Sequence, residues 1–132
     1  SSAASDVYKR QKECFFKGIE AFKDGNRLSD IGIAVQTYAE SFGYGVVREM
    51  VGHGIGRKMH EDPEVPNYFT GRRGPRLEPG MALAIEPMIT LGSPDICLDE
   101  NQWTVSTIDK KPAAHYENTT ILTKNGLEIL TL

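Results

Sequence analysis

All three histidines of the chain, His53, His60 and His115, stand in short segments that could belong to one metal site. A lone carboxylate, Glu86, interrupts an apolar run later in the chain. Imidazole and carboxylate groups are the ligands that suit divalent zinc, manganese, cobalt or iron. These residue types therefore indicate chemistry that depends on a divalent cation.

The two glutamates of interest both lie in apolar surroundings. A charge in the middle of an apolar strand is costly to bury unless it is paired or bound to a metal, and Glu86 alone is explained at least as well by an ion pair with an arginine. Glu117, near the start of another apolar stretch, repeats the situation. Two such carboxylates on adjacent strands would repel each other unless a cation lay between them. The pair therefore favours a metal.

The histidines differ in their local settings. His53 lies between Gly52 and Gly54, where the missing side chains let the backbone approach its neighbours and take unusual dihedral angles. A histidine in such a loop is more often a structural hydrogen-bonding group, but the two glutamates favour a ligand. His60 could bind a substrate and act as an acid or electrophile, or it could be an exposed histidine held by a neighbouring carboxylate. His115 is assigned to support of the metal site or to the surface.

Two helices are expected to precede these residues. Apolar residues recur at helical spacing over residues 6–23, and residues 24–26 read as a helix stop and turn. Ser29 is the expected N-cap of the second helix, supported by Asp30 near the positive end of the helix dipole.

The rest of the chain favours strands and loops. Residues 52–56 are too rich in glycine for a regular element, and residues 62–80 have the prolines, glycines and charges of a long structured loop. Residues 81–91 predict one apolar strand, in which alternation places Glu86 on the same face as Ala82, Ala84 and Met88. Further strands are expected at residues 46–49, 95–99, 103–108, 116–123 and 127–132. Two helices followed by a mainly antiparallel sheet make an α+β fold.

Composition limits the class of protein and its partners. The chain has 132 residues, enough for one domain or part of a larger one, with a net charge of −3 and a pI of about 5.6. No strong positive field draws in nucleic acid or an anionic membrane. Cys14 and Cys97 suggest neither a disulfide framework nor a zinc knuckle, which fits a cytoplasmic protein. Residues 1–5 are expected to be a non-native or disordered leader, with the domain covering residues 6–132.

Six short motifs follow one another at characteristic spacings between Gly52 and Thr119, within a longer stretch, from about Cys14 to the end of the chain, that carries the same resemblance. They are Gly52-His53-Gly54-Ile55-Gly56-Arg57, Met59-His60-Glu61-Asp62-Pro63, Glu78-Pro79-Gly80-Met81, Ile85-Glu86-Pro87-Met88, Trp103-Thr104-Val105 and Tyr116-Glu117-Asn118-Thr119. Each motif is moderately specific, and the set is highly specific. Together the motifs resemble those of the type I methionine aminopeptidases.

The resemblance implies a fold and an activity. Type I methionine aminopeptidases are cytosolic metalloexopeptidases that remove the N-terminal methionine from nascent chains. Their pita-bread fold consists of two pseudo-symmetric halves. A pair of divalent metals, which the sequence does not identify among cobalt, manganese, iron and zinc, activates a water molecule and polarises the scissile carbonyl.

The resemblance also implies residue roles. By match, His53 and Glu86 would ligate one metal, and Glu117 would bridge both metals. His60 would be the catalytic residue that contacts the scissile peptide of the substrate. Two further substrate-binding residues would wall the pocket for the methionine side chain: Met59 and Trp103.

One departure from the family concerns the missing ligands. The family takes two further aspartate ligands from its N-terminal half, whereas the acids Asp6, Asp24 and Asp30 fall on helix or turn surface. The chain therefore resembles only the C-terminal half of a pita-bread enzyme, whose partner would be the missing N-terminal half. Alone, it is expected to be inactive or nearly so, and to self-associate through the apolar face meant for that half.

Two other functions stay open. A pita-bread peptidase that cleaves Xaa-Pro bonds is disfavoured by the short loop between His60 and Glu86 and by the pairing of Met59 with Trp103. A catalytically dead pita-bread module that binds a partner chain would share the fold without the chemistry. Metal binding and the rates on Met-Gly and Xaa-Pro peptides would separate these functions.

Overall fold

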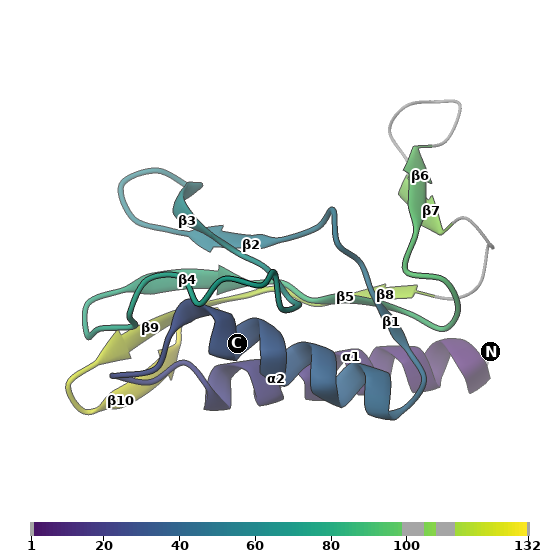
Figure 1. The fold of residues 1–132 in the computed structure, drawn as a ribbon, viewed down its shortest axis with the longest axis horizontal. Coiled ribbons are helices and arrows are strands. Elements are labelled where there is room, and N and C mark those ends of the chain that lie inside the picture. The colour runs from purple at the N-terminus through teal and green to yellow at the C-terminus, as the bar shows by residue number, and fades with distance from the viewer. Residues whose placement is uncertain (1, 99–104, 108–112, 132) are drawn as a thin grey trace.

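The computed structural model describes residues 2–98, 105–107 and 113–131, and Figure 1 shows a layer of strands packed on a layer of helices. Helices α1 (Ser2–Glu20) and α2 (Leu28–Ser41) lie side by side below the strands. The predicted order, two helices followed by a mainly antiparallel sheet, is confirmed. No helix in this described part of the chain is both long and apolar enough to cross a bilayer.

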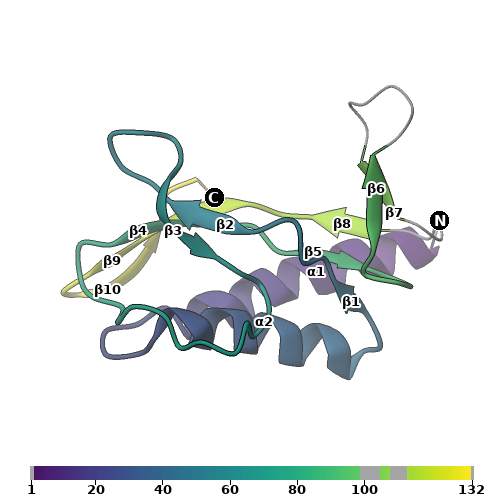
Figure 2. The ribbon, with the colours of Figure 1, turned by 45° about the horizontal axis from the view of Figure 1, so that its top comes forward.

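Within the described residues the strands form two sheets and a separate hairpin, and each of these pairings is antiparallel. The five-stranded sheet has the order β10-β9-β4-β2-β3, and the three-stranded sheet has the order β1-β5-β8. The hairpin β6–β7 projects away from both sheets (Figure 2). The strands are β1 (Gly45–Val46), β2 (Gly52–Gly54), β3 (Glu61–Val65), β4 (Ala82–Ile85), β5 (Met88–Thr90), β6 (Ile96–Leu98), β7 (Val105–Thr107), β8 (Ala113–His115), β9 (Asn118–Thr123) and β10 (Gly126–Ile129).

The helix boundaries differ from those expected. α1 begins at Ser2, so residues 2–5, expected to belong to a non-native or disordered leader, form its first turn. Arg27, not Ser29, is the N-cap of α2. The carboxylate of Asp30 accepts a hydrogen bond of 2.8 Å from the Arg27 backbone N–H, so an acid in the first turn stabilises the helix start.

The core lies between the helices and the sheets. Gly18 allows the two helices to approach closely, because a Cβ there would lie 2.9 Å from Cγ2 of Val35. Each fully buried large apolar side chain stabilises the fold by about 1.5–3 kcal/mol. The two buried apolar clusters consist of Phe15, Phe22, Leu28, Ile31, Val65, Leu77, Leu83, Ile85 and Leu122, and of Val7, Cys14, Val35, Ala39, Val46 and Ile89.

Two segments expected to be irregular contain strands. Residues 52–54 form β2, inside the five-stranded sheet, and residues 61–65 form β3 at its edge, where the missing N–H of Pro63 is tolerated. Neither Gly52 nor Gly54 has a positive φ. A Cβ would lie 2.1 Å from the Ala84 oxygen at Gly52, and 2.2 Å from the Asp62 oxygen at Gly54. These glycines therefore reflect close strand packing and not a free loop.

Candidate metal centre

Glu86 lies at a break in the strand that was expected to be continuous over residues 81–91. β4 ends at Ile85 and β5 begins at Met88. Between them stands Glu86-Pro87, and a proline has no N–H to continue a ladder of backbone hydrogen bonds. The expected continuous strand is therefore wrong at Glu86-Pro87, where the structure has two strands, β4 and β5, with a break between them.

Glu117 lies at a matching break between β8 and β9. The pairs on either side of the break keep one register, so Glu86 and Glu117 stand opposite each other in the same two-stranded ribbon. Tyr116 donates a backbone hydrogen bond of 3.3 Å to the Pro87 oxygen within the break. The flanking pairs are Ile85 with Asn118 and Met88 with His115.

Three side chains converge at this point. One donor atom from each of His53, Glu86 and Glu117 lies within 4.8 Å of the other two. His53 is only 8% exposed, and its Nε2 lies 4.0 Å from Oε1 of Glu86. The Nδ1 of His53 lies 2.9 Å from the backbone oxygen of Gly54. Because a carbonyl oxygen only accepts, this contact places a proton on Nδ1, and the neutral ring then keeps on Nε2 the lone pair that a metal requires.

The electrostatics of the two glutamates favour a cation. Burial, followed by the hydrogen bond and the charge of Glu117, raises the pKa of Glu86 from 4.5 to about 8. Two carboxyl groups this close share a proton when no other positive charge is present. The donor set of one imidazole and two carboxylates fits a zinc-like divalent ion.

His60 lies at the mouth of the same centre. Its ring packs on the ring of His53, with centroids 3.9 Å apart and planes 33° from parallel. Its side chain is exposed, and its neighbour Glu61 accepts a hydrogen bond of 3.2 Å from the Lys58 backbone N–H. His60 therefore has one side against the His53 ring and the other toward solvent.

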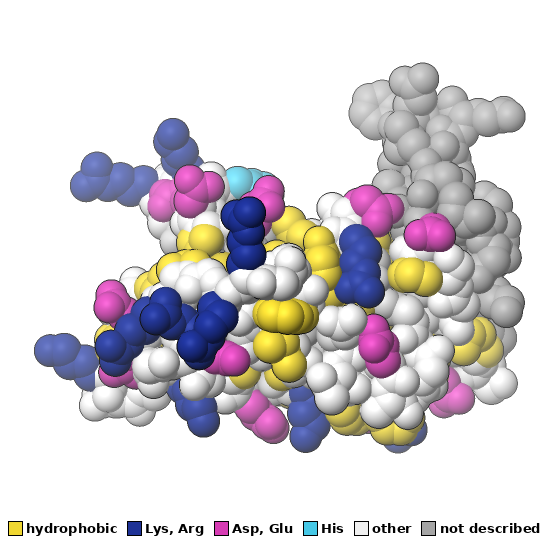
Figure 3. All heavy atoms as spheres, in the orientation of Figure 1, with side chains coloured by type: hydrophobic (Ala, Val, Ile, Leu, Met, Phe, Trp, Pro, Cys, Tyr) yellow, Lys and Arg dark blue, Asp and Glu magenta, His cyan; other side chains and the backbone are white. Residues whose placement is uncertain are grey.

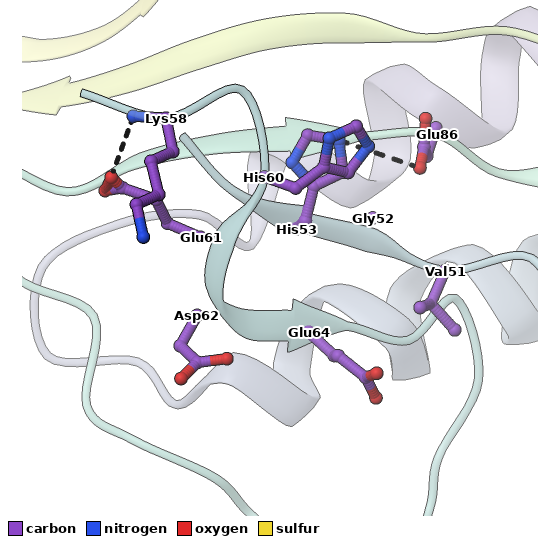
Figure 4. Close-up of a pocket in the computed structure, with 9 residues that line it drawn as sticks. All are labelled: Val51, Gly52, His53, Lys58, His60, Glu61, Asp62, Glu64 and Glu86. Carbon is purple, nitrogen blue, oxygen red and sulfur yellow. Dashed lines mark hydrogen bonds and ion pairs between the residues drawn. The ribbon is translucent and has the colours of Figure 1, made fainter. Parts of the chain in front are cut away.

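An open pocket of about 630 Å³ lies beside the two rings. On the face shown in Figure 3, histidine side chains reach the surface next to acidic ones. Among the residues drawn in Figure 4, Asp62 and Glu64 point away from the imidazoles, and Glu86 faces them. The pocket is lined by Val51, Gly52, His53, Lys58, His60, Glu61, Asp62, Glu64 and Glu86.

The remaining candidates are placed less centrally. The Nε2 of His115 lies 3.8 Å from Oε2 of Glu86, so this carboxylate stands between two imidazoles. Met59, expected to wall a methionine pocket, is 73% exposed and does not line the pocket described above. Its side chain projects from the loop between β2 and β3 into solvent. Trp103 lies outside the described residues.

Two buried residues near the centre were missed in the sequence. Gln11 and Asn67 are both 0% exposed, and their amide groups donate hydrogen bonds to backbone oxygens beside the candidate ligands. The sequence holds one weak indication that Gln11 is buried: it falls between Val7 and Cys14 on the apolar face of the α1 pattern.

Comparison with known proteins gives the family. Residues 1–124 match the model of metallopeptidase family M24, and the chain belongs to that family. It is 58% identical over its 132 residues to a methionine aminopeptidase of Clostridium acetobutylicum, and it covers 53% of that protein.

Solved structures give the same class. The crystal structure of methionine aminopeptidase from Rickettsia prowazekii matches the whole chain with a TM-score of 0.94 and 41% identity, and the chain covers 54% of it. A prolidase from Pyrococcus furiosus matches 97% of the chain with a TM-score of 0.72 and 26% identity, and 32% of that protein is covered. The chain thus spans about half the length of the methionine aminopeptidases it matches, and the expected pita-bread half is confirmed.

Proposed function

We propose that this chain is the part of a methionine aminopeptidase that supplies an imidazole, two carboxylates and a substrate-binding histidine to a metal centre. The observation that carries the proposal is the convergence of His53, Glu86 and Glu117 within 4.8 Å, beside an open pocket. The substrate would be the N-terminal methionine of peptides and nascent chains, and the setting the cytoplasm. The likeness to named methionine aminopeptidases supports this substrate over others.

Each residue has a distinct task in the proposed reaction. A bound divalent cation lowers the pKa of a water molecule and polarises the scissile carbonyl. His53 presents the lone pair of Nε2, since its Nδ1 proton is held by the Gly54 oxygen. Glu86 would release the proton that its raised pKa lets it hold, and Glu117 would supply the second carboxylate. His60, exposed at the pocket and supported by the His53 ring, donates a hydrogen bond to the scissile peptide and thereby orients it.

The number of metal ions follows from the donors. Three protein donors of this kind hold one zinc-like ion in other enzymes. A second ion would share Glu117 and would need further carboxylates from the part of the relatives that this chain does not span. The proposed partner of the chain is therefore the other half of the same domain, and the 132-residue chain alone is expected to cleave little or nothing.

The test uses the whole protein that carries this chain, supplied with Mn²⁺, Co²⁺, Fe²⁺ or Zn²⁺ in turn. Release of methionine from Met-Gly peptides is expected to exceed cleavage of Xaa-Pro peptides. Glu117→Gln should abolish that activity, and Glu128→Gln, a matched substitution on β10, should leave it unchanged. Faster cleavage of Xaa-Pro peptides would overturn the proposal in favour of a prolidase. A whole protein that binds none of the four ions would make the chain a binding module instead.

A further inference from the structure

We propose that Gln11 and Asn67 are positioning residues of the metal centre. Their buried amide groups hold the backbone where β4 gives way to β5 and where β8 gives way to β9, the two places that carry the candidate ligands Glu86 and Glu117. The inference deepens the proposed function and rests on it, because a positioning role has meaning only if these ligands bind a metal.

Gln11 joins helix α1 to both breaks. Its Nε2 donates to the backbone oxygen of Pro87 at 3.0 Å and to that of Tyr116 at 3.5 Å. Pro87 adjoins Glu86, and Tyr116 adjoins Glu117. The two hydrogens of a single amide nitrogen therefore reach the backbone next to both carboxylates.

The chemistry of Pro87 explains why an outside donor is useful here. In a closely paired antiparallel position, each residue donates its N–H to the oxygen of the other. Tyr116 donates to Pro87 in this way, but Pro87 has no N–H to return to the Tyr116 oxygen. Gln11, on helix α1, supplies a hydrogen bond to that oxygen instead.

Asn67 makes a similar link from another direction. Its Nδ2 donates to the Glu86 backbone oxygen at 3.3 Å and to the Met50 oxygen at 3.2 Å. Met50 stands three residues before His53 on the segment that leads into β2. Asn67 thus connects the backbone of one candidate carboxylate ligand to the approach of the candidate imidazole ligand.

Helix α1 also contacts the break between β8 and β9 through an aromatic side chain. The ring of Phe15, one turn along the helix from Gln11, packs edge-on against Tyr116 with centroids 5.3 Å apart. Phe15 fixes the side chain of Tyr116, and Gln11 fixes its backbone. The residue before Glu117 is therefore held on both sides by one rigid helix.

Stability alone gives a weak reason for these amides. The Oε1 of Gln11 and the Oδ1 of Asn67 are buried without a hydrogen-bond partner among the described residues. An unsatisfied buried oxygen offsets part of what the amide hydrogen bonds contribute to stability. The distinctive property of these amides is therefore their link to the carbonyl groups beside Glu86 and Glu117.

The test measures metal affinity in the whole protein by titrating the apoprotein with Co²⁺ and following its visible absorption, which reports the ligand geometry. Gln11→Met and Asn67→Leu keep the side-chain volume and remove the donors. Each is expected to weaken Co²⁺ binding about 10-fold and to change the intensities of the absorption bands. Cys14→Ala, in the same helix, destabilises through lost packing alone and should bind Co²⁺ within about twofold of wild type.

The outcomes separate this inference from the proposed function. If the wild-type protein binds no Co²⁺, the proposed function fails. If it binds Co²⁺ and both amide variants bind equally well, or if Cys14→Ala weakens binding as much as they do, the positioning role is wrong. Should Gln11→Met not fold, Gln11→Asn keeps a buried amide but withdraws it by one methylene, and the same loss of affinity is expected.

Discussion

Carboxyl oxygens of Glu86 and Glu117 lie within 4.8 Å of each other across the break between β4 and β5. Burial and the neighbouring Glu117 raise the pKa of Glu86 to about 8, so at neutral pH Glu86 holds a proton in the cation-free protein. A divalent cation between them would take the place of that proton. The proton and the divalent cation therefore compete for the same pair of carboxyl groups.

The first prediction concerns the stability of the cation-free protein. The pKa of Glu86 is raised from 4.5 to about 8, so between these values the native state holds a proton that the unfolded chain has released. The free energy of unfolding should therefore fall as the pH rises through this range, by at most about 1.4 kcal/mol per pH unit, and level off above it. Urea unfolding of the apoprotein measures this slope. Glu86→Gln should remove it, and an unchanged slope in that variant would show that the proton is held elsewhere.

The second prediction concerns metal binding. Since the cation displaces the shared proton, affinity should rise with pH by up to about tenfold per unit and become constant above the pKa of about 8 of Glu86. Calorimetric titration at pH 7 in two buffers of different ionisation enthalpy counts the protons released, and we expect about one from the glutamate pair. In Glu117→Gln the pKa of Glu86 loses a cause of its elevation, so the pH dependence should move to lower pH. Affinity that does not vary between pH 6 and 8 would contradict the shared proton.

The order of helices and strands was predictable from the sequence, and so was the set of candidate residues that converge at the centre, because the signals for both are local. His53 between glycines and Glu86 in an apolar run are unusual in their immediate surroundings, and the helical and strand patterns are local too. The break at Pro87 was not predicted because hydrophobic periodicity treats residues 81–91 as one apolar segment. Gln11 was missed for a different reason: its partner Pro87 lies 76 positions away, and a hydrogen bond over that separation leaves no pattern in either segment.

The third prediction separates catalysis from metal binding. His60 offers no donor to the group formed by His53, Glu86 and Glu117, yet it lies at the pocket. In the whole protein, His60→Ala should lower kcat on a Met-Gly peptide about 10²–10⁴-fold and leave the affinity for Mn²⁺ within about threefold. His60→Gln, which keeps a hydrogen-bond donor, should recover part of the loss. A fall in metal affinity equal to the fall in rate would make His60 a support for the His53 ring.

The fourth prediction concerns the reactivity of Cys14. Burial raises the pKa of its thiol to about 12, and the thiolate is the reactive form. In a Cys97→Ser background, iodoacetamide at pH 8 should modify Cys14 only at the rate at which the protein unfolds. Addition of urea should raise that rate in step with the unfolded fraction. Rapid alkylation in native conditions, followed by peptide mass spectrometry, would show that α1 opens without global unfolding.

The fifth prediction tests the close packing that brings His53 into the centre. A Cβ at Gly54 would lie 2.2 Å from the Asp62 oxygen, a backbone atom that no side-chain movement relieves. Gly54→Ala should therefore force β2 away from β3 and lower the free energy of unfolding by about 3 kcal/mol or more. Gly71→Ala is the control, because that glycine has a φ of +90° but no atom within 4 Å of an added Cβ. This variant should lower the free energy of unfolding by only about 1–2 kcal/mol.

Because β2 carries His53, we also expect Gly54→Ala to weaken metal binding and Gly71→Ala to leave it unchanged. Equal losses of stability in the two variants would mean that the β2–β3 contact is looser than the structure shows.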